Sequence, residues 1–293
     1  MSAAEVSASE SLETRYTSVC NRVAAAAKRG GRSPGDVILV AVTKSAEPDQ
    51  IRALLQLGHR DFGENRVQQL VQRASMVDEF LARQRLLPSS RTLNDPDQQT
   101  LFGGGAEIKL PPVAGSPVSS GGVRWHMIGH LQRNKARKVA DFVRLIHSVD
   151  SLRLAEELQQ LSLRRDHVIE VLLQVNCSGE ETKFGCPVPA AIPMAEQLES
   201  MINVRLRGVM TMAAPSDNPD LARATFGRCR ELFEEIKRSG VTDPARFNIL
   251  SMGMSDDFEV AIAEGSNVVR VGSAIFGAGD KASEPEAEED DGG

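Results

Sequence analysis

Short apolar segments alternate with helical patterns along most of the chain, and this alternation constrains the fold more than any other feature of the sequence. The segment VILVAV (37–42) is continuously apolar, as expected for a strand buried on both faces, and Pro48-Asp49 then opens a helical stretch. The same pattern recurs, and it predicts further strands at 59–63, 124–129, 144–149, 168–176, 204–212, 247–252 and 267–271. Eight strands, most of them followed by a helical pattern, indicate a parallel α/β fold.

Chain length and the number of strand–helix units select among the parallel α/β folds. Eight units within 293 residues favour a single (β/α)8 barrel, or TIM barrel, over a doubly wound sheet. The sequence has no GxGxxG fingerprint that opens a helix, which weakens the case for a dinucleotide-binding domain. Residues 8–29 end in a run of alanines and in Lys28-Arg29 before Gly30-Gly31, so we expect an extra N-terminal helix ahead of the barrel.

Three segments do not follow the alternation. Residues 88–122 contain five prolines, six glycines and five serines with no apolar period, so they cannot bury enough surface to offset their ordering entropy. We therefore predict a disordered insertion at about residues 84–122, between the second helix and the third strand. We predict disorder also for residues 1–7 and for the acidic tail at 279–293, which leaves residues 8–278 as one barrel domain.

Charge balance and cysteine content argue against several classes of protein. The net charge is −6, but the last ten residues hold six acids and no base, so the rest of the chain has 34 basic and 34 acidic residues. A nucleic-acid or anionic-membrane binder needs a basic excess, so we expect neither partner. Four scattered cysteines without a CxxC pair, an N-terminus without an apolar leader and the absence of a membrane-length apolar run indicate a cytoplasmic protein.

Functional groups of a barrel of this kind lie at the carboxyl ends of its strands. Lys44 ends the first predicted strand and presents one amine at the mouth of the barrel. Partial desolvation there would make this amine nucleophilic toward an aldehyde. The alternative is an ordinary solvated lysine at the end of a strand, and Lys44 alone does not decide between them.

The last two predicted strands each run into a turn rich in glycine and serine. Ser251 and Gly253 lie after the seventh strand, where Ser255 is placed to cap the next helix, and Gly272 and Ser273 follow the eighth strand. Free backbone N–H groups beside such residues bind anions, and barrels commonly hold phosphate at these two loops. Turns and helix caps use the same residue types, so position in the strand order gives the pattern most of its weight.

Arg270 is a charged residue inside the otherwise apolar segment VVRV. A buried guanidinium is costly unless it is paired or hydrogen-bonded. Arg270 therefore either forms an ion pair with a carboxylate of the barrel or donates to a ligand at the barrel centre.

Seven segments together carry a family resemblance. In chain order they are AVTK, FGENRVQQ, WHMIGHLQRNKARKV, IHSVD, LRGVMTM, LSMGMSDDFEVAIAEG and VRVGSAIFG. With these motifs, residues 8–80 and 123–278 closely resemble the pyridoxal phosphate homeostasis protein family. The resemblance implies a single alanine-racemase-like barrel, of the class called fold type III among proteins that bind pyridoxal 5′-phosphate (PLP).

The resemblance also implies a role for individual residues. Lys44 would hold PLP as an internal aldimine, Arg270 would face the pyridine nitrogen, and Ser251 with the backbone of Gly272 and Ser273 would hold the phosphate. The remaining residues that would border the cofactor are Asn65, His126, Ile128, Met210 and Gly253.

Three functions follow as hypotheses. The first is a non-catalytic protein of vitamin B6 homeostasis that holds PLP in the cytoplasm, is monomeric and has PLP-dependent apo-enzymes as candidate partners. The second is an amino-acid racemase, but Arg270 at the pyridine nitrogen would weaken the electron sink, and Tyr16, the only tyrosine, lies in the N-terminal helix rather than at the site. The third is a cofactor-free aldolase in which Lys44 reacts with a sugar phosphate.

Other candidate residues receive a structural interpretation. His126 and His130 are four residues apart, but on a strand that runs into a turn they do not share a face, so we expect no metal there. The basic residues of the helix after the third strand (Arg133, Lys135, Arg137, Lys138) are expected to form a solvated face. The cysteines are expected to be small buried or loop residues, and Lys183 is the alternative to Lys44 as the amine of the pocket.

Overall fold

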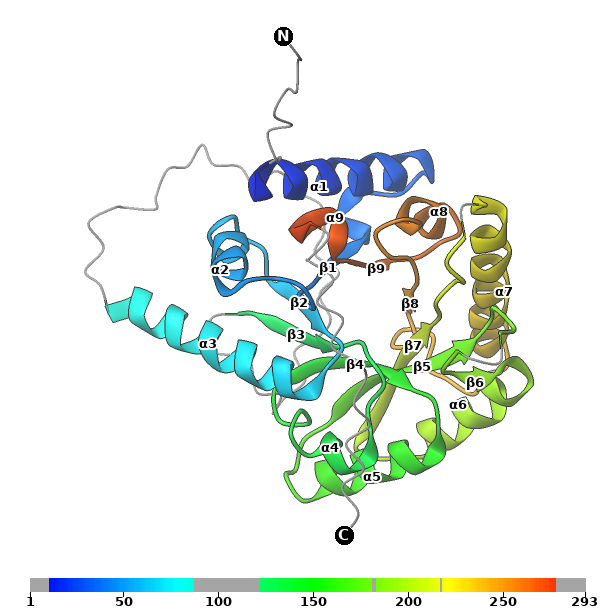
Figure 1. Cartoon of the computed structure of the whole chain (residues 1–293). Coiled ribbons are helices and arrows are strands. Elements are labelled where there is room, and N and C mark those ends of the chain that lie inside the picture. Colours follow the sequence, from blue (N-terminus) through cyan, green and yellow to red (C-terminus); the bar gives the residue numbers. More distant parts are fainter. Residues whose placement is uncertain (1–10, 87–121, 181–182, 217, 278–293) are drawn as a thin grey trace.

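The chain folds into a closed barrel of parallel strands surrounded by helices, as seen in a computed structural model that describes residues 11–86, 122–180, 183–216 and 218–277 (Figure 1). The strands run in the order β4-β3-β2-β1-β9-β8-β7-β5, and a pairing between β4 and β5 closes the ring. Their bounds are β1 (Ile38–Val42), β2 (Asp61–Glu64), β3 (Arg124–Met127), β4 (Val143–Val149), β5 (Ile169–Asn176), β7 (Val204–Met210), β8 (Ile249–Ser251) and β9 (Val268–Val271). The (β/α)8 fold expected from the sequence is confirmed.

Helices cover the outside of the barrel, and an additional helix precedes it. The helices are α1 (Leu12–Arg29), α2 (Pro48–Gln56), α3 (Val67–Leu86), α4 (Arg133–Ala136), α5 (Leu152–Leu163), α6 (Ala191–Glu199), α7 (Pro219–Arg238), α8 (Phe258–Ala263) and α9 (Ser273–Phe276), with short 3-10 turns at η1 (Pro34–Asp36) and η2 (Val188–Ala190). Within the described ranges, no helix is long and apolar enough to cross a membrane.

Some element boundaries differ from the sequence prediction. All eight predicted strands are present, and a two-residue strand β6 (Cys186–Pro187) pairs with β5 in addition. Helix α1 stops at Gly30 and Gly31 as expected, with Gly31 at a φ of 69°. Helix α3 continues to Leu86, beyond the predicted start of the insertion at about residue 84. Residues 87–121 of that insertion, residues 1–7 and the acidic tail lie outside the described residues.

Two apolar clusters hold the barrel together. The larger one fills the layer between the outer faces of the strands and the helices. The smaller one fills the barrel interior and consists of Val40, Leu145, Leu172, Met210, Ile249 and Val268. A strand that is buried on both faces has to be apolar on both, which is why segments such as VILVAV show no alternation of apolar and polar residues.

The amino end of the barrel is closed by buried charge. Glu170 at the start of β5 is paired with Arg207 at 2.7 Å and with Arg144 at 2.6 Å. Arg207 is the extra residue of a bulge in β7, since Leu206 pairs with Val171 and the following Gly208 already pairs with Leu172. A Cβ atom at Gly208 would overlap the carbonyl oxygen of Ile249, so this position requires glycine. The carboxyl end is therefore the end at which a ligand could enter.

Candidate functional site

The strand register brings the predicted site residues together at the carboxyl end of the barrel. Val42 of β1 pairs with Gly63 of β2, and Ala41 pairs with Val271 of β9. The residues that follow these strands, including Lys44 and Asn65, therefore emerge side by side. A Cβ atom at Gly272 would lie 3.2 Å from the carbonyl oxygen of Val42, so glycine allows the turn after β9 to approach the end of β1.

Lys44 lies in a turn directly after β1, and its side chain is exposed. The partial desolvation that we expected from its place at the barrel mouth is therefore not present in this structure. Exposure leaves the amine free to move and to meet an incoming aldehyde. It also means that removing the side chain opens no cavity in the core.

A buried carboxylate, Glu64, supports the turn that carries Lys44. Glu64 is fully buried, pairs with Arg73 of α3 and accepts a hydrogen bond from the Thr43 hydroxyl at 2.9 Å. Its other oxygen accepts the backbone N–H of Asn65 at 2.8 Å, and Arg73 also donates to the Ala46 carbonyl at 3.1 Å. Glu64 and Arg73 thus connect the loops after β1 and β2. Sequence reasoning missed this group, although a glutamate in the buried segment DFGE was a signal.

Asn65 and its neighbours form a close-packed edge of the site. The side-chain oxygen of Asn65 is buried and has no hydrogen-bond partner among the described residues. A Cβ atom at Gly129 would overlap the Asn65 backbone, so glycine is needed where the loop after β3 passes. Ile128, half-buried, lies against Gly63, where a Cβ atom would be 3.3 Å from its Cδ1. Asn65 and Ile128 therefore lie on the same side of the mouth as Lys44.

Arg270 is buried in β9, with 3% of its surface exposed, and it is hydrogen-bonded to neutral groups. Its guanidinium donates to the Ser251 hydroxyl at 2.6 Å and to the Thr211 carbonyl at 3.1 Å. Within the described part of the chain it forms no salt bridge, so the ion-pair interpretation of Arg270 is wrong. Burial lowers the pKa of Arg270 to about 10, with Asp257 acting in the opposite direction. Arg270 remains a cation that can act only as a donor.

Two histidines connect Ser251 to the far side of the barrel. His147 on β4 contacts Ser251 Oγ through Nδ1 at 3.0 Å and His126 Nδ1 through Nε2 at 2.9 Å. His126, predicted to line the cofactor ring, lies in the barrel interior, where its Nε2 contacts Asp61 at 3.2 Å. Sequence reasoning did not single out His147 or Asp61, although both are polar residues within predicted strands.

The turns after β8 and β9 are joined in a way that the sequence prediction did not anticipate. Ser255 does not cap α8, which begins at Phe258 with Asp257 at its N-cap. Instead, the Ser255 hydroxyl accepts the backbone N–H of Gly272 at 3.2 Å, because the two turns pack against each other. Gly253 has a φ of 92°, and its carbonyl accepts the Arg270 N–H at 3.0 Å. Ser273 is the first residue of α9 beside this contact.

The remaining predicted residues fall into separate environments. Met210 is buried in the barrel interior and pairs with Ser251 in register. His130 is exposed and stacked on Phe184 with ring centroids 4.3 Å apart, whereas His126 is buried in the barrel interior, so the two histidines do not share a face. The Nζ atom of Lys183 lies 3.8 Å from Oε2 of Glu180, with which it forms an ion pair. The described ranges contain no cluster of three or more metal-ligating side chains.

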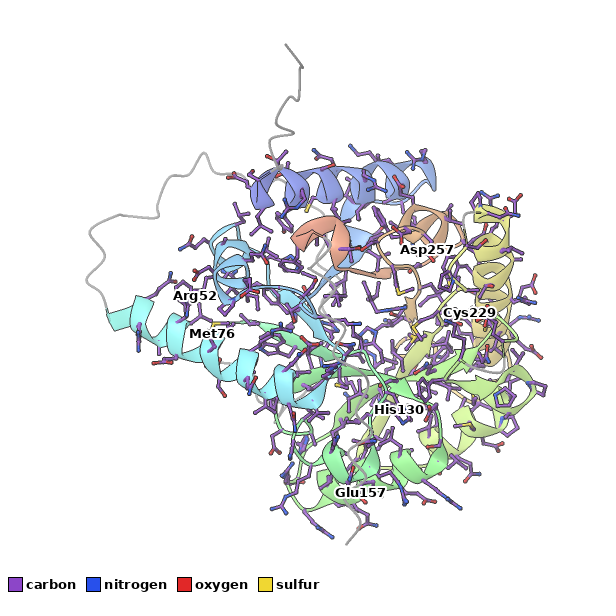
Figure 2. The ribbon with its side chains drawn as sticks, in the orientation of Figure 1. Arg52, Met76, His130, Glu157, Cys229 and Asp257 are labelled. Atoms are coloured by element: carbon purple, nitrogen blue, oxygen red, sulfur yellow. The ribbon has the colours of Figure 1, made fainter. Side chains whose placement is uncertain are left out.

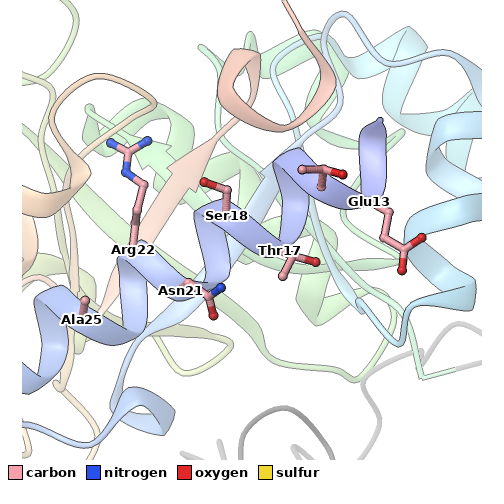
Figure 3. Close-up of a pocket in the computed structure, with 7 residues that line it drawn as sticks. Glu13, Thr17, Ser18, Asn21, Arg22 and Ala25 are labelled. Atoms are coloured by element: carbon pink, nitrogen blue, oxygen red, sulfur yellow. The ribbon is translucent and has the colours of Figure 1, made fainter. Parts of the chain in front are cut away.

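The other interpretations made from the sequence can be placed as well. The basic residues on and after α4 are exposed, except for the half-buried Lys135. All four cysteines are buried free thiols, and Cys229 packs from α7 toward the barrel (Figure 2). A shallow groove along α1, lined by Glu13, Thr14, Thr17, Ser18, Asn21, Arg22 and Ala25, includes none of the predicted site residues (Figure 3). Its lining comes from one helix face, so it is not the cofactor site.

Comparison with known proteins identifies the class and then the family. Residues 28–280 match the family model of the alanine racemase N-terminal domain, so the fold and the site define an alanine-racemase-like barrel. The pyridoxal phosphate homeostasis protein of Pseudomonas aeruginosa is 35% identical over 263 residues, which are 89% of this chain and 93% of that protein. The protein of the same name from Escherichia coli K12 is 32% identical, over 89% of this chain and 94% of that protein. The chain belongs to the pyridoxal phosphate homeostasis protein family.

A solved structure with a bound ligand is also similar. PipY from Synechococcus elongatus, determined with PLP bound, is 29% identical to this chain with a TM-score of 0.64. The match covers 88% of this chain and all of PipY. The resemblance to this family that the sequence motifs indicated is confirmed.

Proposed function

We propose that this protein binds PLP at the carboxyl end of its barrel, attached covalently to Lys44, and serves in PLP homeostasis without turning over a substrate. The observation that carries the proposal is the convergence at one barrel end of an exposed amine, a close glycine turn and a buried guanidinium. The relatives named pyridoxal phosphate homeostasis proteins and the PLP-bound PipY support it.

The residues present suit this cofactor. The buried Asn65 oxygen without a partner is a polar atom available to a ligand at the edge of the site. The Gly272–Ser273 turn packs tightly against the end of β1, where a Cβ atom at Gly272 would lie 3.2 Å from the Val42 carbonyl oxygen, so glycine brings this turn close to the barrel mouth. Arg270 places a charged donor 2.6 Å from the Ser251 hydroxyl, at the end of β8. The aldehyde, the phosphate and the pyridine nitrogen of PLP thus each have a candidate partner among the residues at this end of the barrel.

Each residue then has a role in binding. When bound, PLP supplies an aldehyde that condenses with a lysine amine with loss of water, which holds the cofactor covalently. Lys44 provides the amine from its exposed turn, and Glu64 with Arg73 keeps that turn in place. Ser251, Gly253, Gly272 and Ser273 would lie at the phosphate end, whereas Asn65, Ile128 and Met210 would border the ring. Arg270 would donate to the pyridine nitrogen, and His126 would act on the site only through its contact with His147.

Two features favour a carrier over a racemase. A guanidinium that donates to the pyridine nitrogen disfavours protonation of that nitrogen and so weakens the ring as an electron sink. The hydroxyl of Tyr16 bonds to His59 at 3.1 Å, just before the start of β2, whereas Lys44 follows the end of β1. Tyr16 is therefore at the opposite end of the strands and does not supply a second acid–base group.

Cofactor binding is tested by titrating dialysed protein with PLP, reducing it with borohydride and measuring the intact mass and the modified peptide. We expect one reduced cofactor per chain, attached at Lys44. Lys138→Ala, which changes an exposed lysine on the outside of the barrel, is the matched control and should bind normally. Absence of a stoichiometric adduct in the parent protein would reject the proposal.

Lack of turnover is tested separately. The loaded protein is incubated with single L-amino acids, and the D-forms are measured by chiral chromatography. We expect no more D-amino acid than in a control sample that contains denatured protein. Stoichiometric binding together with sustained racemisation would support PLP binding and reject the carrier role.

A further inference from the structure

A continuous chain of hydrogen bonds crosses the interior of the barrel from β9 to β2, and all of its members are buried. In order, the bonds are Arg270 Nη1 to Ser251 Oγ at 2.6 Å, Ser251 Oγ to His147 Nδ1 at 3.0 Å, His147 Nε2 to His126 Nδ1 at 2.9 Å, and His126 Nε2 to Asp61 Oδ1 at 3.2 Å. The first group belongs to the candidate cofactor site, and the last lies near the amino end of β2.

The two ends of this chain have fixed roles. A guanidinium has donors only, and an ionised carboxylate has acceptors only. Burial alone would raise the pKa of Asp61, but hydrogen bonds from Arg124 and His126 outweigh it and lower this pKa below its usual range. Asp61 is therefore ionised, and Arg270 is a cation. Arg124 also gives Asp61 a counter-charge, at 2.7 Å from Nε to Oδ1.

If the His126 ring is neutral, the direction of every bond between these ends follows. Burial lowers the pKa of His147 well below its usual value, and Arg270 acts in the same direction, so His147 is neutral. With Asp61 as acceptor, His126 donates through Nε2–H, and its neutral ring then accepts at Nδ1. His147 then donates through Nε2–H and accepts at Nδ1, where the Ser251 hydroxyl donates. Ser251 Oγ in turn accepts from Arg270, and all four bonds point toward Asp61.

We propose that His147, backed by His126 and Asp61, is a positioning residue. It fixes the Ser251 hydroxyl, with its proton directed to the barrel interior, where this hydroxyl accepts from Arg270 and so keeps Arg270 aimed at the cofactor. This inference rests on the proposed cofactor site. While both rings are neutral, the Ser251 hydroxyl is also unavailable as a donor to phosphate.

The hydrogen-bond direction is tested without cofactor by long-range ¹H–¹⁵N NMR on the unliganded protein. We expect both His126 and His147 as neutral Nε2–H tautomers. A proton on Nδ1 of either ring would reverse at least one bond and overturn the inference, whether or not the protein binds PLP.

The effect on the site is tested with two variants of one residue. His147→Asn keeps an acceptor near the position of Nδ1, whereas His147→Gln places its amide near Nε2 and loses the contact to Ser251. We expect His147→Gln to weaken PLP binding about two- to tenfold, the worth of one neutral hydrogen bond, and to shift the absorption band of bound PLP. His147→Asn should restore both. His167→Gln, a buried histidine bonded to the Ala140 carbonyl outside the chain, is the matched control and should leave the band unchanged.

A second test uses coupling between residues. If His147 acts through Ser251, then Ser251→Ala and the double variant with His147→Gln should have equal affinities for PLP. Additive losses, or equal effects of His147→Asn and His147→Gln, would reduce His147 to a structural residue. A parent protein that fails to bind PLP would reject the proposed function instead, and the NMR result would still stand.

Discussion

On the β1–β2 side of the barrel mouth the proposed functional side chain, that of Lys44, is exposed and its support is buried. On the β8–β9 side the proposed functional side chain, that of Arg270, is itself buried. Lys44 extends from a turn that Glu64 and Arg73 hold from beneath. Arg270 is fixed at both ends of its guanidinium by Ser251 and Thr211. The two sides thus use different means to place one cationic group each.

This difference matches two kinds of chemistry. A covalent bond to Lys44 holds its partner by itself, so the amine gains from freedom to approach and needs no fixed orientation before reaction. A hydrogen bond from Arg270 is weak unless it is aligned and shielded from water, so the guanidinium gains from burial and rigid partners. The comparison predicts losses of different kinds when each side is altered.

The largest effect is expected from the exposed side. Lys44→Ala should abolish covalent attachment of PLP while leaving the free energy of unfolding of the unliganded protein nearly unchanged, because the side chain contributes no buried contact. Borohydride reduction with intact-mass measurement reports the attachment, and urea unfolding reports the stability. An adduct at full stoichiometry in this variant would move the assignment to Lys183.

In contrast to Lys44→Ala, a change in the buried support of the Lys44 turn should lower the free energy of unfolding. Arg73→Leu leaves the fully buried Glu64 without its cation and should lower the free energy of unfolding by about 3–5 kcal/mol, the cost of stranding a buried charge. Arg52→Leu on α2 breaks an exposed pair with Asp49 and should cost at most about 1 kcal/mol. Urea unfolding of both variants measures the contrast. Similar small losses would mean that Glu64 is not the element that holds the turn.

The sequence also predicted the residues of the two sides with unequal success. Strand ends can be located from apolar segments, and a charge or a glycine is conspicuous there. The sequence therefore singled out as candidates Lys44, Ser251, Gly253, Arg270, Gly272 and Ser273. Glu64, Asp61 and His147 were not found, since their partners Arg73, Arg124 and Ser251 are distant in sequence and meet only when the barrel closes. Periodicity locates a strand, but it does not report which neighbour its side chain contacts.

Local sequence patterns also predicted where a helix ends better than which group a side chain contacts. The stop of α1 at Gly30-Gly31 follows from the conformational freedom of glycine and was predicted. Ser255 has the residue type and spacing of a helix cap, yet its hydroxyl binds the turn after β9, because tertiary packing offered it another donor. A cap signal and a loop contact use the same hydroxyl, and sequence alone does not separate them.

The buried side is probed by Arg270→Gln, which keeps polar atoms but removes the charge. We expect cofactor retention to weaken about ten- to a hundredfold, because a hydrogen bond from a charged donor is typically worth about 1.5–3 kcal/mol. Covalent attachment at Lys44 should persist. Dialysis half-life and equilibrium titration measure retention, after circular dichroism has confirmed the fold. A variant that folds and binds as tightly as the parent would make Arg270 a structural residue only.

The smallest effect is expected at Asp61, where the chain from Arg270 ends. Because hydrogen bonds lower the pKa of Asp61 in the folded protein, its contribution to stability is complete above its unfolded pKa, about 4, and is lost as the pH falls below that value. Asp61→Asn keeps the acceptor oxygen but not the charge, so at pH 7 the free energy of unfolding should fall by about 1 kcal/mol, the difference between a charged and a neutral hydrogen bond. Between pH 4 and pH 2 the parent should lose this advantage and its curve should approach that of the variant. Asp141→Asn, which removes the exposed partner of Arg165, is the control and should give no such convergence. Parallel curves for parent and Asp61→Asn down to pH 2 would mean that Asp61 carries no buried charge and that the chain of hydrogen bonds lacks its fixed end.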